Sequence, residues 1–329
     1  MDTTIALKII TNEIELFRSQ TIYDELIIDF MGGEPLLNFQ VIKECSEFIW
    51  NTYPNVNCKL FLRTNGTLLS DRMKEWFVSN RHRISVGLSL DGGPSIQNSN
   101  RTNSYSHIPI NFFLKNWPQQ KIKATISPIG LDKLAENIIK FHDKGYPFDV
   151  TIALGVEWSD KHAEIFENQM IILMNYYLNH PEIEPVKNLF EHDFRNIIKS
   201  NDDQFTMCGT NGEIIAYTSH GDAVICHMFG DITMGENYAE INLKAPKYLE
   251  TDTECCNCIA KSICKICPAN NYLTNKNFHI QDKRICKMLR VIVKINAMFY
   301  CRKFNNAVIK GHEISPRDWK LLEIALNLF

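Results

Sequence analysis

The sequence predicts an α/β fold in which a parallel sheet covered by helices is followed by a small cysteine-rich module. Three observations predict it. Short apolar segments alternate with amphipathic ones in the first half, the series opens with a helix, and eight of the eleven cysteines fall between residues 208 and 286. Apolar strands joined by helical crossovers form parallel sheets, so we expect one such sheet in the first half.

Strands are expected where apolar residues form short runs, and helices where apolar residues recur at helical spacing. The expected strands cover residues 25–31, 59–63, 84–90, 123–127 and 148–154. The expected helices cover residues 3–19, 38–50, 70–78 and 131–144, with one short helix between the third and fourth strands.

The first helix has Asp2 or Thr3 as its expected N-cap, which leaves no room for a strand before it in these 329 residues. A βα unit normally begins with its strand. We therefore expect the sheet to lack its first strand and to present an unpaired edge, which is a liability that another segment should cover.

The second half is expected to be largely helical. Its helices are expected at 161–179, 186–200 and 287–305, and Ser315-Pro316 begins a last helix through Leu328. The clustered cysteines all follow residue 200, so we expect two domains: residues 1–200 form the sheet and its linking helices, and residues 201–329 the cysteine-rich domain with C-terminal helices.

Charge and hydropathy exclude several classes of partner. The formal net charge of −3 is too small to indicate a nucleic-acid or membrane-surface partner. No apolar run approaches the roughly 20 residues that span a bilayer. The N-terminal residues do not resemble a signal peptide, because they lack a basic start and polar residues interrupt the apolar ones. We therefore expect a cytoplasmic protein.

In a reducing compartment, clustered cysteines are more often metal ligands or redox groups than disulfides. The clustered cysteines are Cys208, Cys226, Cys255, Cys256, Cys258, Cys264, Cys267 and Cys286. Their spacing suits two four-ligand sites, and Gly221 is expected to allow the turn that returns Cys226 toward Cys208. Spacing alone leaves zinc and iron–sulfur clusters as alternatives.

Polar residues follow three of the expected strands. Gly32-Gly33-Glu34-Pro35 follows the first, Thr64-Asn65-Gly66-Thr67 the second, and Ser89-Leu90-Asp91-Gly92 ends the third. Ligands bind at the carboxyl ends of parallel strands. Two glycines allow a ligand to approach the backbone, and Glu34 can accept hydrogen bonds from an ammonium group. Taken alone, the Gly-Gly-Glu-Pro segment is also an ordinary strand-to-helix turn.

Taken together, these residues resemble the radical S-adenosylmethionine (radical SAM) enzymes that carry a SPASM domain, such as anaerobic sulfatase maturases and radical peptide maturases. The segments MGGEP, TNGT and SLDG occur in the family's order. They are followed by the pattern Cys-x12-Gly-x4-Cys, Cys-x2-Cys-x5-Cys and a final Cys. The resemblance covers about residues 3–290. It implies an incomplete (β/α)6 parallel partial barrel without its first strand, followed by a small SPASM iron–sulfur domain.

The resemblance also implies cofactors, partners and site residues. Gly32, Gly33 and Glu34 would bind the amino group of S-adenosylmethionine, and Asn65, Ser89, Asp91 and Arg101 would line the cofactor and substrate cavity. Cys208, Cys226 and Cys267 would bind a first auxiliary [4Fe-4S] cluster, and Cys255, Cys258, Cys264 and Cys286 a second. The function implied is an oxidoreductase that modifies a precursor peptide or protein, in which a 5′-deoxyadenosyl radical abstracts a hydrogen atom and an electron donor supplies electrons.

Four departures from the family pattern stand out. The CxxxCxxC motif, which binds the cluster that cleaves S-adenosylmethionine, is absent from these 329 residues. Cys264 and Cys267 are separated by two residues, where the family has three. His227 takes the place of a proton-accepting aspartate, either in the same role or as a packed or solvated histidine. No cysteine before Cys208 completes the first auxiliary site, so Asp202, Asp203 or Cys256 would serve, or the site stays open for a substrate.

Three functions follow from these patterns. The first is a radical SAM peptide maturase, inactive in this chain alone because the cluster loop is absent. The second is a catalytically degenerate protein that keeps the fold and the auxiliary clusters but binds a peptide or a partner enzyme. The third is a zinc-stabilised interaction module. The intact Gly-Gly-Glu-Pro segment favours the first over the second.

Overall fold

The computed structural model describes residues 1–190, 213–246, 249, 253–264, 266–311 and 313–327. The chain separates into two compact units. The first comprises Met1–Ala124, Lys144–Asp149 and Tyr217–Ala223, and the second comprises Thr125–Asp143, Val150–Ala216 and Val224–Phe329. The predicted domain boundary at residue 200 stays a prediction.

Three parallel strands form the sheet of the first unit. They are β1 (Leu26–Phe30), β2 (Cys58–Thr64) and β3 (Ile84–Leu88), in the order β1-β2-β3. An isolated parallel bridge joins Ser89, just after β3, to Lys123 of β4 (Ile122–Ile126). A further two-stranded sheet pairs β4 with β5 (Phe148–Ile152). The five predicted strands and the parallel arrangement of the first three are therefore confirmed.

The helices of the first unit follow the predicted ranges closely. They are α1 (Thr3–Ser19), α2 (Phe39–Thr52), α3 (Asp71–Ser79), α4 (Pro94–Asn100) and α5 (Ile110–Asn116), with short 3-10 turns at Pro35–Asn38 and Tyr105–His107. The Asp2 carboxylate caps α1 by accepting from the backbone N–H of Ile5 at 2.9 Å. The prediction of a single short helix between the third and fourth strands was wrong, since α4 and α5 both lie there.

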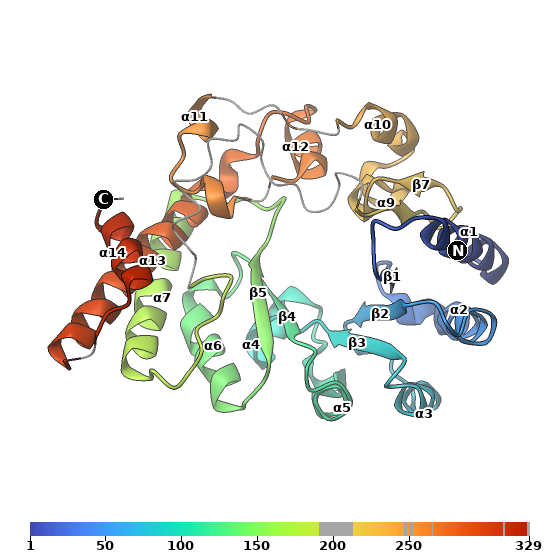
Figure 1. The fold of residues 1–329 in the computed structure, drawn as a ribbon, viewed down its shortest axis with the longest axis horizontal. Coiled ribbons are helices and arrows are strands. Elements are labelled where there is room, and N and C mark those ends of the chain that lie inside the picture. Colours follow the sequence, from blue (N-terminus) through green and yellow to red (C-terminus); the bar gives the residue numbers. More distant parts are fainter. Residues whose placement is uncertain (191–212, 247–248, 250–252, 265, 312, 328–329) are drawn as a thin grey trace. The chain divides into compact units, whose positions relative to one another are not determined.

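The core of this unit lies between the sheet and α2, α3 and α5, which Figure 1 shows together on one side of the strands. Leu60 and Leu62 of β2 are buried, and so is Phe77 of α3. In the described residues, β1 is an edge strand of its sheet, and its Ile27 is 62% exposed.

The second unit is built on long helices. Its elements after residue 130 are a 3-10 turn (Leu131–Lys133), α6 (Leu134–Asp143), α7 (Asp160–Asn179), a 3-10 turn (His227–Phe229), α9 (Asp231–Met234), α10 (Tyr238–Lys244), α11 (Thr253–Cys256), a 3-10 turn (Lys261–Ile263), α12 (Pro268–Asn275), a 3-10 turn (Lys283–Ile285), α13 (Cys286–Ile309) and α14 (Pro316–Asn327). Two short strands, β6 (Ala216–Tyr217) and β7 (Ala223–Val224), pair with each other.

Helix α13 packs along α7 and α14, as Figure 1 shows. The carboxamide of Asn296 on α13 is buried and donates to the Leu189 carbonyl oxygen at 2.6 Å. The predicted helix at 186–200 is not present where it can be checked, because residues 187–190 form turns, and residues 191–200 lie outside the described residues. Among the described helices, none combines the length and apolarity needed to cross a membrane.

Candidate functional site

Glu34 joins the loop after β1 to the end of β2. Its carboxylate Oε1 accepts from the Leu36 backbone N–H at 3.1 Å and from the Thr64 hydroxyl at 2.6 Å, and its Oε2 accepts from the Asn65 N–H at 2.9 Å. A carboxylate offers about four acceptor positions, so most of its capacity is committed to the protein. Few acceptor positions therefore remain on this carboxylate for the ammonium group of a ligand, and its binding of such a group stays a prediction. Its role in holding the loop was not predicted.

Neither the backbone conformation nor the packing requires glycine at the two positions before Glu34. Neither Gly32 nor Gly33 has a positive φ. A Cβ placed on Gly33 would meet nothing within 4 Å, and one on Gly32 would be 3.8 Å from the Glu34 nitrogen, an ordinary contact. Both residues are exposed. Neither conformation nor packing explains the two glycines, and their role in letting a ligand approach the backbone stays a prediction.

The loop after β2 is held mainly by its own side chains. The Asn65 side-chain oxygen accepts from the Thr67 N–H at 2.9 Å and from the Thr67 hydroxyl at 2.7 Å. Gly66 has a φ of +77°, and a Cβ there would lie 3.1 Å from the ring of Phe113. The Ser89 N–H donates to the Thr64 carbonyl oxygen at 2.9 Å. Contacts therefore link the ends of β1, β2 and β3.

Asp91 and Arg101 form a two-point ion pair beyond the end of β3. Arg101 Nε lies 2.8 Å from Asp91 Oδ2, and Arg101 Nη2 lies 3.2 Å from Asp91 Oδ1. The Asp91 side chain is 4% exposed and that of Arg101 36%. The fully buried Gln97 fixes the same loop by accepting from the Asp91 N–H at 2.8 Å. The structure thus brings Asp91 and Arg101 together, while their role in lining a ligand cavity stays a prediction.

In the second unit, Gln281 links two of the predicted ligands, and two more lie near one of them. The Cys255 thiol donates to Gln281 Oε1 at 3.0 Å, and Gln281 Nε2 donates to the Cys264 sulfur at 2.9 Å. The pKa of the Cys264 thiol is raised to about 11, mainly by burial; the Gln281 hydrogen bond acts to lower it, and the nearby Cys286 and Cys258 act to raise it. Burial and then Cys258 likewise raise the pKa of Cys286. Gln281 belongs to none of the sequence motifs, and for this reason it was not predicted as a site residue.

The thiols of Cys226 and Cys267 share a different environment. Cys226 is buried in an apolar cluster with Val224, Phe229, Ile241 and Ala269, and Cys267 packs against that cluster. Cys267 also caps α12, because its sulfur accepts from the Asn270 N–H at 3.4 Å. Cys208, together with the alternative ligands Asp202 and Asp203, lies outside the described residues.

The Gly221 turn before Cys226 is present, with a φ of +93° at that residue. His227 is exposed overall, yet its ring loses enough contact with water to lower the pKa of the imidazole. A lowered pKa keeps the ring neutral and able to accept a proton at neutral pH. Its assignment as a proton acceptor stays a prediction.

Among the described side chains, no group of three or more His, Cys, Asp or Glu residues is arranged to hold a single metal ion. The scattered Cys45 and Cys58 lie on α2 and β2 of the first unit. The pKa of each thiol is raised to about 11, mainly by burial and to a smaller extent by a neighbouring glutamate.

No family model matches the chain. Over 294 residues, or 82% of this chain, it is 21% identical to the radical SAM cyclopropyl synthase TigE of Paramaledivibacter caminithermalis. Over 69 residues it is 36% identical to an uncharacterized protein of Methanocaldococcus jannaschii. The chain aligns with 60% and 23% of the length of these two relatives, less than two thirds of either.

Solved structures show the same fold. The chain resembles the anaerobic sulfatase-maturating enzyme anSMEcpe with bound AdoMet (TM-score 0.62, 20% identity, 92% of this chain and 85% of that one). It also resembles that enzyme with AdoMet and the Cp18Cys peptide (TM-score 0.59, 19% identity, 99% and 91%). The predicted resemblance to the radical SAM enzymes is thereby confirmed at the level of the fold. Closure into a partial barrel and the SPASM details stay predictions.

Proposed function

We propose that this chain, whose fold is that of the radical SAM enzymes, is an iron–sulfur protein for the modification of a ribosomally made peptide or protein. The observation that carries the proposal is the grouping of four cysteines in one part of the second unit. The Gln281 carboxamide joins Cys255 to Cys264, and Cys258 and Cys286 lie close enough to Cys264 to raise its pKa. Cys255 lies in α11 and Cys286 begins α13, and apolar packing alone gives no reason for thiols at all four positions.

The donor set fits a four-iron cluster. Thiolates are the usual ligands of such clusters, and four of them complete one. Cys255, Cys258, Cys264 and Cys286 would hold the second auxiliary cluster. Cys226 and Cys267, with Cys208, would hold the first. Loss of four thiol protons would accompany loading of the second site, and metal binding would supply folding free energy to this region.

At the ends of the strands, the chain's own residues would hold S-adenosylmethionine in place. Gly32 and Gly33 leave the backbone open to the amino group of that cofactor. Glu34 fixes their loop through Leu36, Thr64 and Asn65. The pair of Asp91 and Arg101 fixes the loop after β3. When bound to a cluster of its own, the cofactor supplies the radical that abstracts hydrogen from a peptide.

The 329 residues contain no CxxxCxxC motif to hold that further cluster. Hydrogen bonds from the loop after β1 contribute roughly 1–3 kcal/mol each when a charge is involved, so binding of S-adenosylmethionine by this chain alone should be weak, on the order of high micromolar or poorer. We therefore propose that this chain by itself does not cleave the cofactor. The alternative is a degenerate binding or partner protein that keeps the auxiliary clusters.

A peptide or protein is the proposed substrate, in line with the peptide bound by anSMEcpe. An electron donor is the further proposed partner, His227 the proposed proton acceptor, and the cytoplasm the proposed compartment.

The test compares two chains that differ only in the cluster loop. The protein is purified without oxygen, loaded with iron and sulfide, and incubated with S-adenosylmethionine and dithionite. We expect no 5′-deoxyadenosine from the chain as written, and we expect it to form once a strand carrying CxxxCxxC is fused before Met1. Formation by the unfused chain above a reductant-only control would contradict the proposal. Failure of a fully loaded fusion to form it would favour the binding-protein alternative.

A further inference from the structure

We infer that the Gln281 carboxamide is a hydrogen-bond donor to the second cluster and raises the reduction potential of that cluster. The inference rests on the proposed function, because it takes Cys255 and Cys264 to be cluster ligands. It assigns a role to a residue that belongs to none of the family's motifs.

The geometry places one amide between thiols from two different segments. Cys255 lies in α11, which ends at Cys256, and Cys264 follows the Lys261–Ile263 turn. Gln281 Nε2 donates to the Cys264 sulfur at 2.9 Å, and Gln281 Oε1 accepts from the Cys255 thiol at 3.0 Å. Gln281 is 9% exposed, so water competes little for its N–H groups.

The backbone beside Gln281 is held by α12. The Asn275 side chain donates to the Ile280 carbonyl oxygen at 2.8 Å, and the Asn271 side chain donates to the Phe278 carbonyl oxygen at 2.8 Å. The Asn271 side-chain oxygen in turn accepts from the Asp282 N–H at 3.1 Å. Residues on both sides of Gln281 are thereby anchored to the helix that begins just after Cys267.

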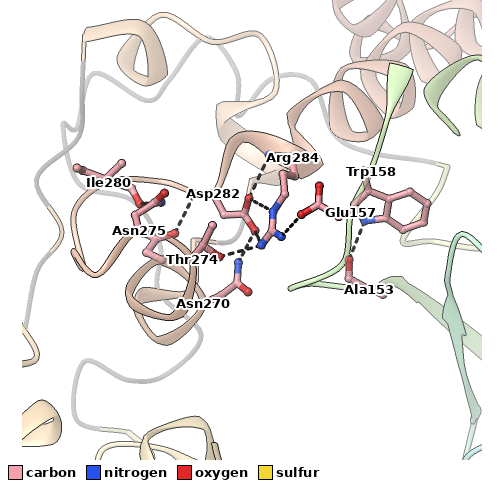
Figure 2. A network of polar contacts seen from close by, with 10 residues as sticks. Ala153, Glu157, Trp158, Asn270, Thr274, Asn275, Ile280, Asp282 and Arg284 are labelled. Atoms are coloured by element: carbon pink, nitrogen blue, oxygen red, sulfur yellow. Dashed lines mark hydrogen bonds and ion pairs between the residues drawn. The ribbon is translucent and has the colours of Figure 1, made fainter. Parts of the chain in front are cut away.

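Arg284 fixes the following turn, as Figure 2 shows. Its Nε and Nη2 each donate to Asp282 at 2.8 Å, its Nη2 also to the Thr274 hydroxyl at 2.8 Å, and its Nη1 to Glu157 at 2.9 Å. Asp282 accepts a further hydrogen bond from the buried Asn270 side chain at 2.8 Å. Burial acts to raise the pKa of Asp282, but these hydrogen bonds and the Arg284 charge outweigh it and lower the pKa. Gln281 therefore projects from a loop with little freedom to move.

Iron binding would affect the two hydrogen bonds of the Gln281 carboxamide differently. A ligating Cys255 has no thiol proton, so it can no longer donate to Oε1. The bond to Cys264 uses the N–H of Gln281 as donor, and a thiolate accepts it more strongly than a thiol does. Reduction adds negative charge to the cluster and its sulfurs. A donor to one sulfur stabilises the reduced form most, which raises the potential.

The experiment measures the potentials of both clusters by redox titration followed by electron paramagnetic resonance in the full, iron-loaded chain. Gln281→Leu removes the donor at similar size. We expect the second cluster to shift to a more negative potential and the first to stay unchanged. Gln281→Glu keeps the shape but adds a charge, and it should shift the second cluster further. Gln169→Leu is the matched control, because Gln169 lies on α7 and its side-chain oxygen accepts from the Ala135 backbone N–H instead of contacting a cysteine.

A second readout does not depend on any variant retaining its cluster. In wild-type protein labelled with ¹⁵N in glutamine side chains, pulsed resonance of the reduced second cluster should detect one weakly coupled nitrogen. Unchanged potentials in a fully loaded Gln281→Leu protein, equal shifts of both clusters, or no coupled nitrogen would overturn the inference. If the wild-type protein holds zinc or no iron, the proposed function fails first, and iron analysis separates that failure from this one.

Discussion

The Thr64 hydroxyl donates to the Glu34 carboxylate at 2.6 Å, which ties the loop after β1 to the last residue of β2. Thr64 is 1% exposed, so water cannot replace Glu34 as its partner. The Gly-Gly-Glu-Pro segment is thus held in shape by its own glutamate, whatever ligand it receives.

Glu34→Ala should lower the stability of the first unit and loosen this loop. The change removes the acceptor of three hydrogen bonds and leaves the proton of the buried Thr64 hydroxyl without an acceptor, which costs about 1–3 kcal/mol, although this oxygen still accepts from the Gly66 N–H. The midpoint of thermal unfolding should fall by several degrees, and Thr64→Val should fall less. Glu15→Ala, which alters only an exposed pair with Arg18, should change little. An unchanged midpoint in Glu34→Ala would show that the carboxylate does not hold the loop.

Arg101→Lys should weaken the loop after β3 even though the charge is kept. A lysine cannot reproduce the two-point contact with Asp91, whose side chain is 4% exposed. We expect a loss of about 1–3 kcal/mol, limited because Arg101 itself is partly exposed. Lys59→Met is the control, since its pair with Glu25 lies largely in water. Equal thermal midpoints for the two variants would contradict the importance of the two-point geometry.

Gly221→Ala should destabilise the protein more than Gly145→Ala. Both glycines have a positive φ, which costs an alanine roughly 1–2 kcal/mol. At Gly221 the new Cβ would also lie 2.8 Å from Ile5 Cγ2, whereas at Gly145 it would meet nothing within 4 Å. Thermal unfolding of both variants checks the difference. Equal losses would mean that the turn does not press against α1.

The free energy of unfolding should fall as the pH drops, in part because of His142. Burial lowers the pKa of this imidazole, which lies 2.9 Å from the Tyr177 hydroxyl. As the pH falls, the unfolded state therefore binds a proton on this ring before the folded state does. The stabilisation that the neutral ring contributes is present above about pH 6.5, and it is lost as the pH falls from there through the lowered pKa of the folded state. His142→Gln should lose less stability than wild type between pH 7.5 and 5.5, measured by thermal unfolding. The exposed His82→Gln should follow wild type, and identical pH dependence in all three proteins would contradict the assignment.

The sequence predicted most elements because each signal is local. Apolar runs marked β1 to β5 but not the short β6 and β7, and Asp2 marked the start of α1 as the cap that the structure contains. One short helix was expected between β3 and β4 where the structure has two, although Pro94 at the first turn of α4 was a signal that could have located one of them. The helix expected from residue 186 fails at its start, where Asn188 donates to the Val150 carbonyl oxygen instead.

The site was predicted less completely because its contacts are distant in sequence. Glu34 meets partners about thirty residues away, and no local pattern announces them. Gln281 lies 17 residues from Cys264 and 26 from Cys255, and a single glutamine has no spacing to recognise. The cysteines were easier to predict as metal ligands, because so many clustered thiols have few other roles in a protein.

The metal content of the cysteine-rich region tests the central claim most directly. Protein purified without oxygen should be brown and should contain about eight irons and eight sulfides per chain, as two four-iron clusters require. Cys258→Ala should lose about half of the iron and leave the segment at 205–290 sensitive to protease, because metal binding supplies its folding free energy. Cys58→Ala should keep the full iron content. Colourless protein with stoichiometric zinc, or full iron in Cys258→Ala, would contradict the account.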